Sequence, residues 1–227
     1  MEKPVTTEIL FMEIDRCLLD DGQPSNFIVD VSEGSVFRKP PFDMLYALKS
    51  TEQNPKYHPE GSVWNHTMLV VDMAASVRSN SRDPRAFMWA ALLHDIGKAP
   101  TTRLRKGRLT SYDHDRVGAQ MAMEFLKCFV TDDAFIDTVC GLVRWHMQVL
   151  FATKKPHSAK IQEMSESTDI REIALLGLCD RFGRLNVDKE YESKSIQGFV
   201  KLCEKVLEED FSDVAILLEQ KLGDKMR

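Results

Sequence analysis

Five stretches of this sequence share one irregular pattern, a helical stripe of hydrophobic residues that includes one imidazole or carboxylate. In the clearest case a stripe that begins at Phe87 ends seven residues later on His94, with alanines at the i+3 and i+4 positions between them. This spacing places all four side chains on one face of a helix. The polar positions of the five stripes are His66, His94, His114, His146 and Asp180. The pattern predicts a helical bundle with polar side chains in its interior.

These five polar groups would each be costly to bury alone. A buried imidazole without a hydrogen bond costs roughly 1–3 kcal/mol, and a buried carboxylate costs more. The alternative is that each is an ordinary residue with a local partner. One shared metal site would satisfy all five together, so we interpret the pattern as a metal site in the core of the bundle.

The His94 stripe runs directly into Asp95 and the short sequence that follows it. Gly97 predicts the end of the helix, and Pro100 predicts that the helix does not resume. Asp95 then lies in the last turn, where the negative end of the helix dipole disfavours a carboxylate. A divalent cation bound by His94 and Asp95 would remove this conflict. For this dipeptide alone, the alternative is a core histidine beside a solvated aspartate.

The order of these residues resembles that of the HD superfamily of metal-dependent phosphohydrolases, and His94-Asp95-Ile96-Gly97-Lys98 matches its HDIG signature. Within that superfamily, the stretches 58–67 (HPEGSVWNHT) and 180–184 (DRFGR) resemble the HD domain of the bacterial CCA-adding tRNA nucleotidyltransferases. The resemblance covers about residues 35–190. It implies an HD-type fold and a minimal set of metal ligands: His66, His94, Asp95 and Asp180.

The donor types limit the identity and number of the ions. Imidazole and carboxylate ligands without a thiolate suit iron, manganese, cobalt, nickel or zinc, and we also retain magnesium. With His114 and His146 added, the donors suffice for two ions, and Asp95 is then the natural bridge. The alternative is a single ion, with His114 and His146 contacting substrate phosphate. We therefore expect one or two divalent metal ions.

Three basic residues near the ligand positions are candidates for contacting a substrate phosphate. Lys98 is one turn beyond Asp95 and could stabilise charge on a phosphoryl group, so we assign catalytic roles to Asp95 and Lys98. The resemblance implies a phosphate-binding role for Arg184, and Arg181 is a second candidate.

Other polar features are not counted among the metal ligands, although the basic loop is expected to border the metal site. The basic loop 103–108 lies between two ligand positions and is either a phosphate-attracting lip or a solvated hairpin around Gly107. We favour the hairpin. We expect His58 to shape its loop and His157 to lie at the surface.

Composition and length predict one domain, residues 1–227, because 227 residues that are 43% hydrophobic can form one substantial core. We divide it into N-terminal helices and a loop (about 1–57), an HD core (58–190) and C-terminal helices (191–227).

A net charge of −5 excludes the overall basic footprint of a nucleic-acid coat protein. Five cysteines without a CxxC pair indicate reduced thiols, and we see no signal peptide or membrane span, so we expect a cytoplasmic protein.

The remaining segments also favour helices. Outside the five stripes, helices are expected at about 6–19, 42–48, 195–208 and 212–222. The turn-rich segment 20–41 could hold a short strand at 27–31. Asp169 is expected to cap the Asp180 helix in a capping box with Glu172. The predicted fold is therefore an all-α HD-domain bundle of roughly eight to ten helices with a metal site in its core.

The function predicted from the ligands and the resemblance is metal-dependent hydrolysis of a phosphoester on a nucleotide or an RNA 3′ end. The resemblance favours phosphomonoesterase or 2′,3′-cyclic phosphodiesterase chemistry. CCA addition is not expected, because no Gly-rich strand-turn with paired carboxylates precedes residue 58. The alternatives are a non-catalytic nucleotide-sensing HD module and a (p)ppGpp- or dNTP-type hydrolase. We expect no membrane partner, and the sequence does not predict the oligomeric state.

Overall fold

The computed structural model describes residues 5–154 and 159–226 of the chain. These residues form thirteen α-helices, three short 3-10 helices and one two-stranded sheet. Three of the α-helices (α3, α6 and α10) have only four or five residues, which leaves ten longer ones. The prediction of an all-α bundle is confirmed. Within the described ranges, no helix is both long enough and apolar enough to cross a membrane.

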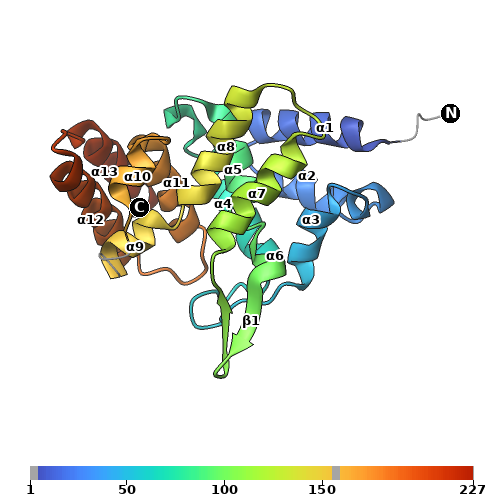
Figure 1. Ribbon diagram of the computed structural model, residues 1–227, viewed down its shortest axis with the longest axis horizontal. Coiled ribbons are helices and arrows are strands. Elements are labelled where there is room, and N and C mark those ends of the chain that lie inside the picture. The colour runs from blue at the N-terminus through green and yellow to red at the C-terminus, as the bar shows by residue number, and fades with distance from the viewer. Residues whose placement is uncertain (1–4, 155–158, 227) are drawn as a thin grey trace.

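The N-terminal part of the bundle consists of short helices that pack on the central ones (Figure 1). Their bounds are α1 Thr7–Asp20, α2 Pro24–Val31, η1 Ser35–Arg38, α3 Asp43–Tyr46 and η2 Ala47–Ser50. The strand predicted at 27–31 is wrong, because these residues belong to α2. Pro24 occupies the first turn of α2, and Ser25 bonds through its N–H and its hydroxyl to the Asp72 carboxylate of α4 (3.0 and 2.6 Å). Tertiary docking therefore overrides the β-propensity of this segment.

The central part holds the polar positions of the five stripes. Its elements are α4 Val63–Ala75, η3 Arg78–Asn80, α5 Pro84–Leu93, α6 Lys98–Thr101, β1 Thr102–Arg105, β2 Arg108–Ser111, α7 His114–Leu126, α8 Asp133–Trp145, α9 Gln148–Lys154, α10 Ile161–Ser165 and α11 Ile170–Phe182. The C-terminal elements, α12 Lys189–Leu207 and α13 Ser212–Met226, lie at the opposite end of the molecule from α1 (Figure 1).

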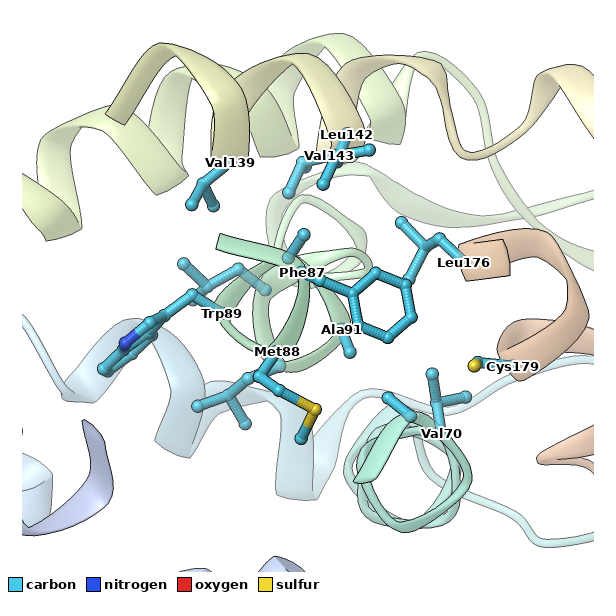
Figure 2. Close-up of a cluster of buried hydrophobic side chains, with 14 of the residues drawn as sticks. Val70, Phe87, Met88, Trp89, Ala91, Val139, Leu142, Val143, Leu176 and Cys179 are labelled. Atoms are coloured by element: carbon cyan, nitrogen blue, oxygen red, sulfur yellow. The ribbon is translucent and has the colours of Figure 1, made fainter. Parts of the chain in front are cut away.

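Helix α5 forms the centre of the core. Asp83 caps its first turn and Pro84 starts it, and every residue from 86 to 93 is buried. Figure 2 shows α5 surrounded by side chains from α8 (Val139, Leu142, Val143), α4 (Val70) and α11 (Leu176, Cys179). A helix that is hydrophobic on all sides can only be buried. The sequence after α5 therefore begins deep inside the protein.

Gly97 does not end α5, contrary to the prediction. The helix ends at Leu93, with His94 as its C-cap, and Gly97 has a helical φ of −70° before the short helix α6. Pro100 lies within α6. Gly97 is instead a point of close approach, because a Cβ there would lie 2.1 Å from the His114 carbonyl oxygen and 2.5 Å from the Gly118 nitrogen. The absence of a side chain lets α6 and α7 meet backbone to backbone.

The capping of α11 is only partly as predicted. Asp169 accepts a hydrogen bond from the Arg171 N–H and is the N-cap. The capping box is wrong, because the Glu172 carboxylate accepts from the Ser81 hydroxyl (2.7 Å) and the Arg82 N–H (2.9 Å). Glu172 therefore ties α11 to the loop that precedes α5. Four of the five cysteines are buried.

Candidate metal centre

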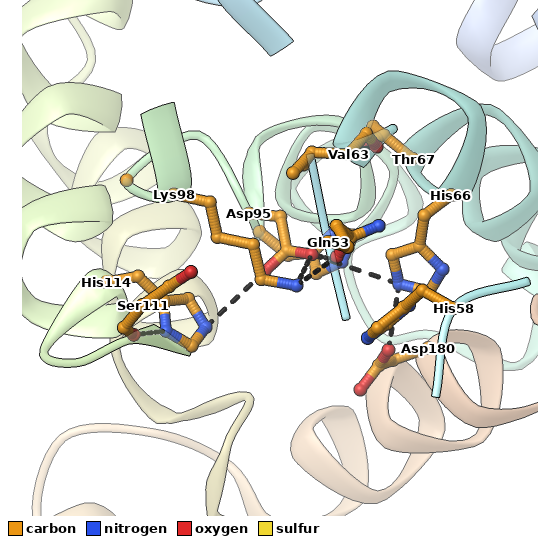
Figure 3. Close-up of polar contacts among 12 residues, drawn as sticks. Gln53, His58, Val63, His66, Thr67, Asp95, Lys98, Ser111, His114 and Asp180 are labelled. Atoms are coloured by element: carbon orange, nitrogen blue, oxygen red, sulfur yellow. Dashed lines mark hydrogen bonds and ion pairs between the residues drawn. The ribbon is translucent and has the colours of Figure 1, made fainter. Parts of the chain in front are cut away.

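The six predicted ligands meet in one largely buried cluster, of which Figure 3 labels His66, Asp95, His114 and Asp180. They come from five helices: His66 from α4, His94 and Asp95 from the end of α5, His114 from the start of α7, His146 from the end of α8, and Asp180 from α11. His66, His94, Asp95 and His146 are each no more than 2% exposed. Side chains far apart in the sequence thus converge where the central helices begin or end.

Asp95 is the centre of this cluster. Its Oδ2 lies 3.2 Å from Nε2 of His94 and 3.9 Å from Nε2 of His66. Its Oδ1 lies 3.4 Å from Nε2 of His114 and 3.8 Å from Nε2 of His146. Each oxygen therefore faces its own pair of imidazoles, the arrangement that a carboxylate bridging two ions would need.

Asp180 and His66 extend the cluster on the Oδ2 side. Oδ1 of Asp180 lies 3.0 Å from Nε2 of His66. Burial alone would raise the pKa of Asp180, but Arg184 and His66 hold that pKa well below its usual range. The pKa of Asp95 is also held well below its usual range, because the effect of burial is outweighed by Lys98 and His94. Both carboxylates are therefore ionised and available to a cation.

Three of the imidazoles are oriented by backbone carbonyls. Nδ1 of His94 donates to the Ala91 carbonyl at 2.9 Å, and Nδ1 of His146 donates to the Val143 carbonyl at 2.7 Å. Both carbonyls belong to the last turn of a helix and would otherwise lack a partner. Nδ1 of His114 donates to the Ser111 carbonyl at the end of β2, also at 2.7 Å. These bonds place a proton on Nδ1 of each ring, so that Nε2 is the nitrogen that can offer a lone pair to a cation.

The lone pairs create a conflict that a cation resolves. Nε2 of His114 and Nε2 of His146 lie 3.2 Å apart. Burial lowers the pKa of His114, and burial together with neighbouring histidines lowers that of His146 to about 4, so both rings are neutral. Nε2 of His94 is buried and has no hydrogen-bond partner among the described residues. The donor set therefore fits one or two divalent ions of the kind that imidazole and carboxylate prefer.

Glu60 is a site residue that the sequence reasoning missed. Its Oε1 lies 3.0 Å from Nδ1 of His66 and 2.9 Å from Nδ1 of His58. Burial alone would raise the pKa of Glu60, but the hydrogen bond with His58 and the nearby imidazole of His66 hold this pKa below its usual range. Glu60 thus faces Nδ1 of His66, as backbone carbonyls face Nδ1 of the other three histidines. It lies in the loop before α4, outside any helical periodicity, and its position in the 58–67 stretch was the only available signal.

Lys98 lies between Asp95 and Gln53. Nζ of Lys98 is 2.6 Å from Oδ2 of Asp95 and 2.7 Å from Oε1 of Gln53. Gln53, in the loop before α4, was also missed, because an amide in a loop carries no pattern. Lys98 is only partly buried, so its ammonium group lies between the buried carboxylate and the surface.

The two predicted arginines have different positions. Arg184 donates to both oxygens of Asp180 (2.9 and 3.2 Å) and so orients that carboxylate. Arg181 is buried and pairs with Glu192 of α12, so the structure does not place it with the other site residues. His58 lies edge-on to His66, with ring centroids 4.8 Å apart. His157 is outside the described residues.

A helical bundle that buries a cluster of histidines and aspartates around a consecutive His-Asp pair defines a class of metal-binding hydrolase domains. The comparison with family models agrees: residues 63–185 match the model of the HD domain, and the chain belongs to this family. The family covers metal-dependent phosphohydrolases. The match includes all six predicted ligands and excludes Gln53 and Glu60.

Curated relatives are similar over part of their length. The chain is 37% identical over 142 residues to the multifunctional CCA protein of Halorhodospira halophila, which covers 62% of this chain and 32% of that protein. It is 29% identical over 146 residues to the multifunctional CCA protein of Pasteurella multocida, and this match covers 64% of this chain and 34% of that protein. It is 33% identical over 100 residues to the multifunctional CCA protein of Actinobacillus pleuropneumoniae, and this match covers 44% of this chain and 24% of that protein. The chain thus spans about a quarter to a third of the length of these relatives.

Proposed function

We propose that this protein is a metal-dependent phosphohydrolase that hydrolyses a phosphomonoester or a 2′,3′-cyclic phosphodiester of a nucleotide or an RNA 3′ end. The observation that carries the proposal is the pair of neutral imidazoles, His114 and His146, whose lone-pair nitrogens face each other 3.2 Å apart beside an ionised Asp95. Because both Nδ1 protons are donated to carbonyls, neither Nε2 of these neutral rings can donate to the other, whereas a metal ion would accept both lone pairs. The resemblance of residues 58–67 and 180–184 to the HD part of CCA-adding enzymes favours a nucleotide or RNA ester.

The proposed ligands form two sets that share Asp95. His66, His94, Asp95 and Asp180 would hold one ion, and Asp95, His114 and His146 would hold a second. Bound divalent ions would supply Lewis-acid polarisation of the phosphoryl group and activation of water. The protein's own contribution is to hold the donors in place: the carbonyls of Ala91, Ser111 and Val143 and the carboxylate of Glu60 fix the four imidazoles, and Arg184 fixes Asp180.

Lys98 has the proposed role of charge stabilisation. Its ammonium group is 2.6 Å from Asp95, and a phosphoryl group at the centre would therefore lie within reach of it. Positioned donors of this kind typically contribute about 10²–10³ in rate. Arg184 is proposed as a positioning residue that acts through Asp180, and Arg181 is no longer part of the proposed site because its charge is paired with Glu192. A cytoplasmic location is part of the proposal and is supported by the buried cysteines.

Metal analysis followed by a substrate screen tests the proposal. The purified protein is analysed for bound metals and then assayed with Mn²⁺, Co²⁺, Ni²⁺, Zn²⁺, Fe²⁺ or Mg²⁺ on p-nitrophenyl phosphate, 2′- and 3′-nucleotides and 2′,3′-cyclic nucleotides. We expect metal-dependent hydrolysis that is absent in Asp95→Ala. Bound metal and tight nucleotide binding without any turnover would contradict the proposal and favour a sensor.

A further inference from the structure

The hairpin formed by β1 and β2 carries three arginines on one face. Arg103 pairs with Thr110 and Arg105 pairs with Arg108 across the two strands. Side chains alternate between the faces of a strand, so Arg103, Arg105 and Arg108 share one face. Lys106 and Gly107 form the turn with φ angles of 49° and 73°, the left-handed values that a tight hairpin turn requires. The hairpin projects away from the helical body (Figure 1).

The charges on this hairpin are not neutralised by the protein. Among the described residues, no carboxylate forms an ion pair with any of its three arginines or with Lys106, and all four are exposed. Like charges directly opposite each other on neighbouring strands destabilise a hairpin, and Arg105 and Arg108 are such a pair. Four unpaired positive charges in a protein of net charge −5 are a local feature that an anionic ligand would stabilise.

Aromatic and apolar groups accompany the charges. Tyr112 directly follows β2 and is 60% exposed, and the guanidinium of Arg105 lies 4.7 Å from the centre of its ring. Leu104, on the opposite face of the hairpin, is 72% exposed. Arginine beside an exposed aromatic ring is a combination that binds phosphates and stacks on bases in single strands.

The base of the hairpin is attached to the metal centre. The Ser111 carbonyl accepts the hydrogen bond that orients His114, and the Thr102 hydroxyl donates to the Lys98 carbonyl (both 2.7 Å). The hydroxyls of Thr102 and Ser111 are also hydrogen-bonded to each other. Four residues of strand rise about 13 Å from this base. The hairpin therefore begins between two site residues and extends outward.

We propose that this hairpin is a binding arm for the phosphate backbone of a single-stranded RNA whose terminal phosphoester lies at the Asp95 centre. The inference rests on the proposed function and narrows it, since it makes an oligonucleotide the preferred substrate over a mononucleotide. The three arginines would contact phosphates several nucleotides before the reacting end, and Tyr112 would stack on a base.

The experiment compares two triple variants that remove the same charge. The test variant is Arg103→Gln with Arg105→Gln and Arg108→Gln. The control variant removes exposed lysines far from the hairpin and combines Lys127→Gln, Lys201→Gln and Lys205→Gln. Binding to a fluorescein-labelled 12-nucleotide RNA with a 3′-hydroxyl is measured by fluorescence anisotropy over a range of salt concentrations, with EDTA present.

We expect the test variant to bind this RNA at least about tenfold more weakly than the parent at low salt. We also expect the slope of log affinity against log salt to fall by about 2, or roughly 0.7 for each lost contact. The control variant should behave as the parent does. The ratio of kcat/KM on a 3′-phosphorylated 12-mer to kcat/KM on a 3′-mononucleotide should fall at least about tenfold in the test variant alone.

Several outcomes decide the proposal. Equal RNA binding by the test variant and the parent overturns it, as does an equal loss in the control variant. No RNA binding by the parent also overturns it and points to an acidic protein surface as the partner. Because binding is measured without turnover, a failure of the arm is distinct from a failure of the proposed function, in which no phosphoester is hydrolysed. A structural role for the arginines predicts a lower melting temperature, whereas removal of like charges predicts an unchanged or higher one.

Discussion

Replacing Gly97 with alanine tests how tightly the metal centre depends on one backbone contact. The new Cβ would lie 2.1 Å from the His114 carbonyl oxygen and 2.5 Å from the Gly118 nitrogen, whereas an ordinary contact begins at 3.4 Å. The two segments would therefore have to separate by about 1.3 Å. Both atoms belong to the backbone, so no rotamer change relieves the clash. Gly97 has helical φ and ψ angles of −70° and −10°, which alanine adopts easily, so any effect must come from the contact.

Overpacking of this kind costs about 2–3 kcal/mol, the upper part of the usual range, because the backbone must move. For a chain of this length, that predicts a fall in Tm of about 4–12 °C. Asp95 is two residues before Gly97, and the Gly97 contact is made with the backbone of His114. A shift at this contact would therefore move His114 away from Asp95. A displacement of about 1 Å at a catalytic centre costs about 10²-fold in rate. We therefore expect Gly97→Ala to lose stability and at least about tenfold in kcat/KM.

The assay combines a thermal melt, metal analysis and kinetics on the best substrate of the screen. Gly198→Ala is the matched control, because a Cβ there would lie 3.5 Å from Thr153 Cγ2, an ordinary contact, in the interior of α12. That variant should melt at the parent temperature or slightly above it, since alanine favours a helix by about 0.5–1 kcal/mol. A Gly97→Ala variant with parent Tm, metal content and kcat/KM would refute the close-approach argument.

Four further predictions follow from the site. Asp95→Ala should abolish both bound metal and hydrolysis while far-UV circular dichroism stays at the parent value; full metal content by elemental analysis would contradict the ligand assignment. Lys98→Met should keep its metal, melt within a few degrees of the parent and lose at least about tenfold in kcat/KM; parent kinetics would leave Lys98 with a structural role only. Glu60→Gln should weaken metal binding about 10–100-fold in a competition titration, with His58→Ala retaining most activity as the comparison. Adding metal to the chelated protein at about 100 times its Kd should stabilise it by about 2.7 kcal/mol, which raises Tm by roughly 5–11 °C, and Asp95→Ala should show no such shift.

The positions of five of the six candidate ligands could be predicted from the sequence because helical periodicity is a local property, and Asp95 could be predicted from its place beside His94 in the HDIG match. A side chain such as His94 that continues a hydrophobic stripe must point the same way as the stripe, toward the core. The two arginines show the same rule. Arg184 is four residues from Asp180, just beyond the end of α11, and donates to its carboxylate, whereas Arg181 is the immediate neighbour of Asp180 and points elsewhere. The i,i+4 spacing alone would have favoured Arg184.

The parts that sequence reasoning missed depend on contacts between distant segments. Glu60 and Gln53 reach the centre from a loop, where no periodicity fixes a direction. Glycine is common both at helix ends and where two backbones approach closely, so the sequence favours a helix stop at Gly97. Only the packing of α7 against Gly97 shows that this glycine is a point of close approach. The segment 27–31 has high β-propensity, but its helical state is set by the docking of Ser25 on α4.

The hydrogen bonds that fix His94, His114 and His146 have a consequence for metal preference. Each imidazole is anchored to a carbonyl three residues before it, so its direction is set by the end of its own helix or strand. An ion bound there would meet donors that cannot adjust their separation to its radius. The spacing between the ends of α5, α7 and α8 would then select among ions of similar chemistry. Val143, which packs against Gly118, sets part of that spacing. A change of its volume would shift the choice of metal without altering any ligand.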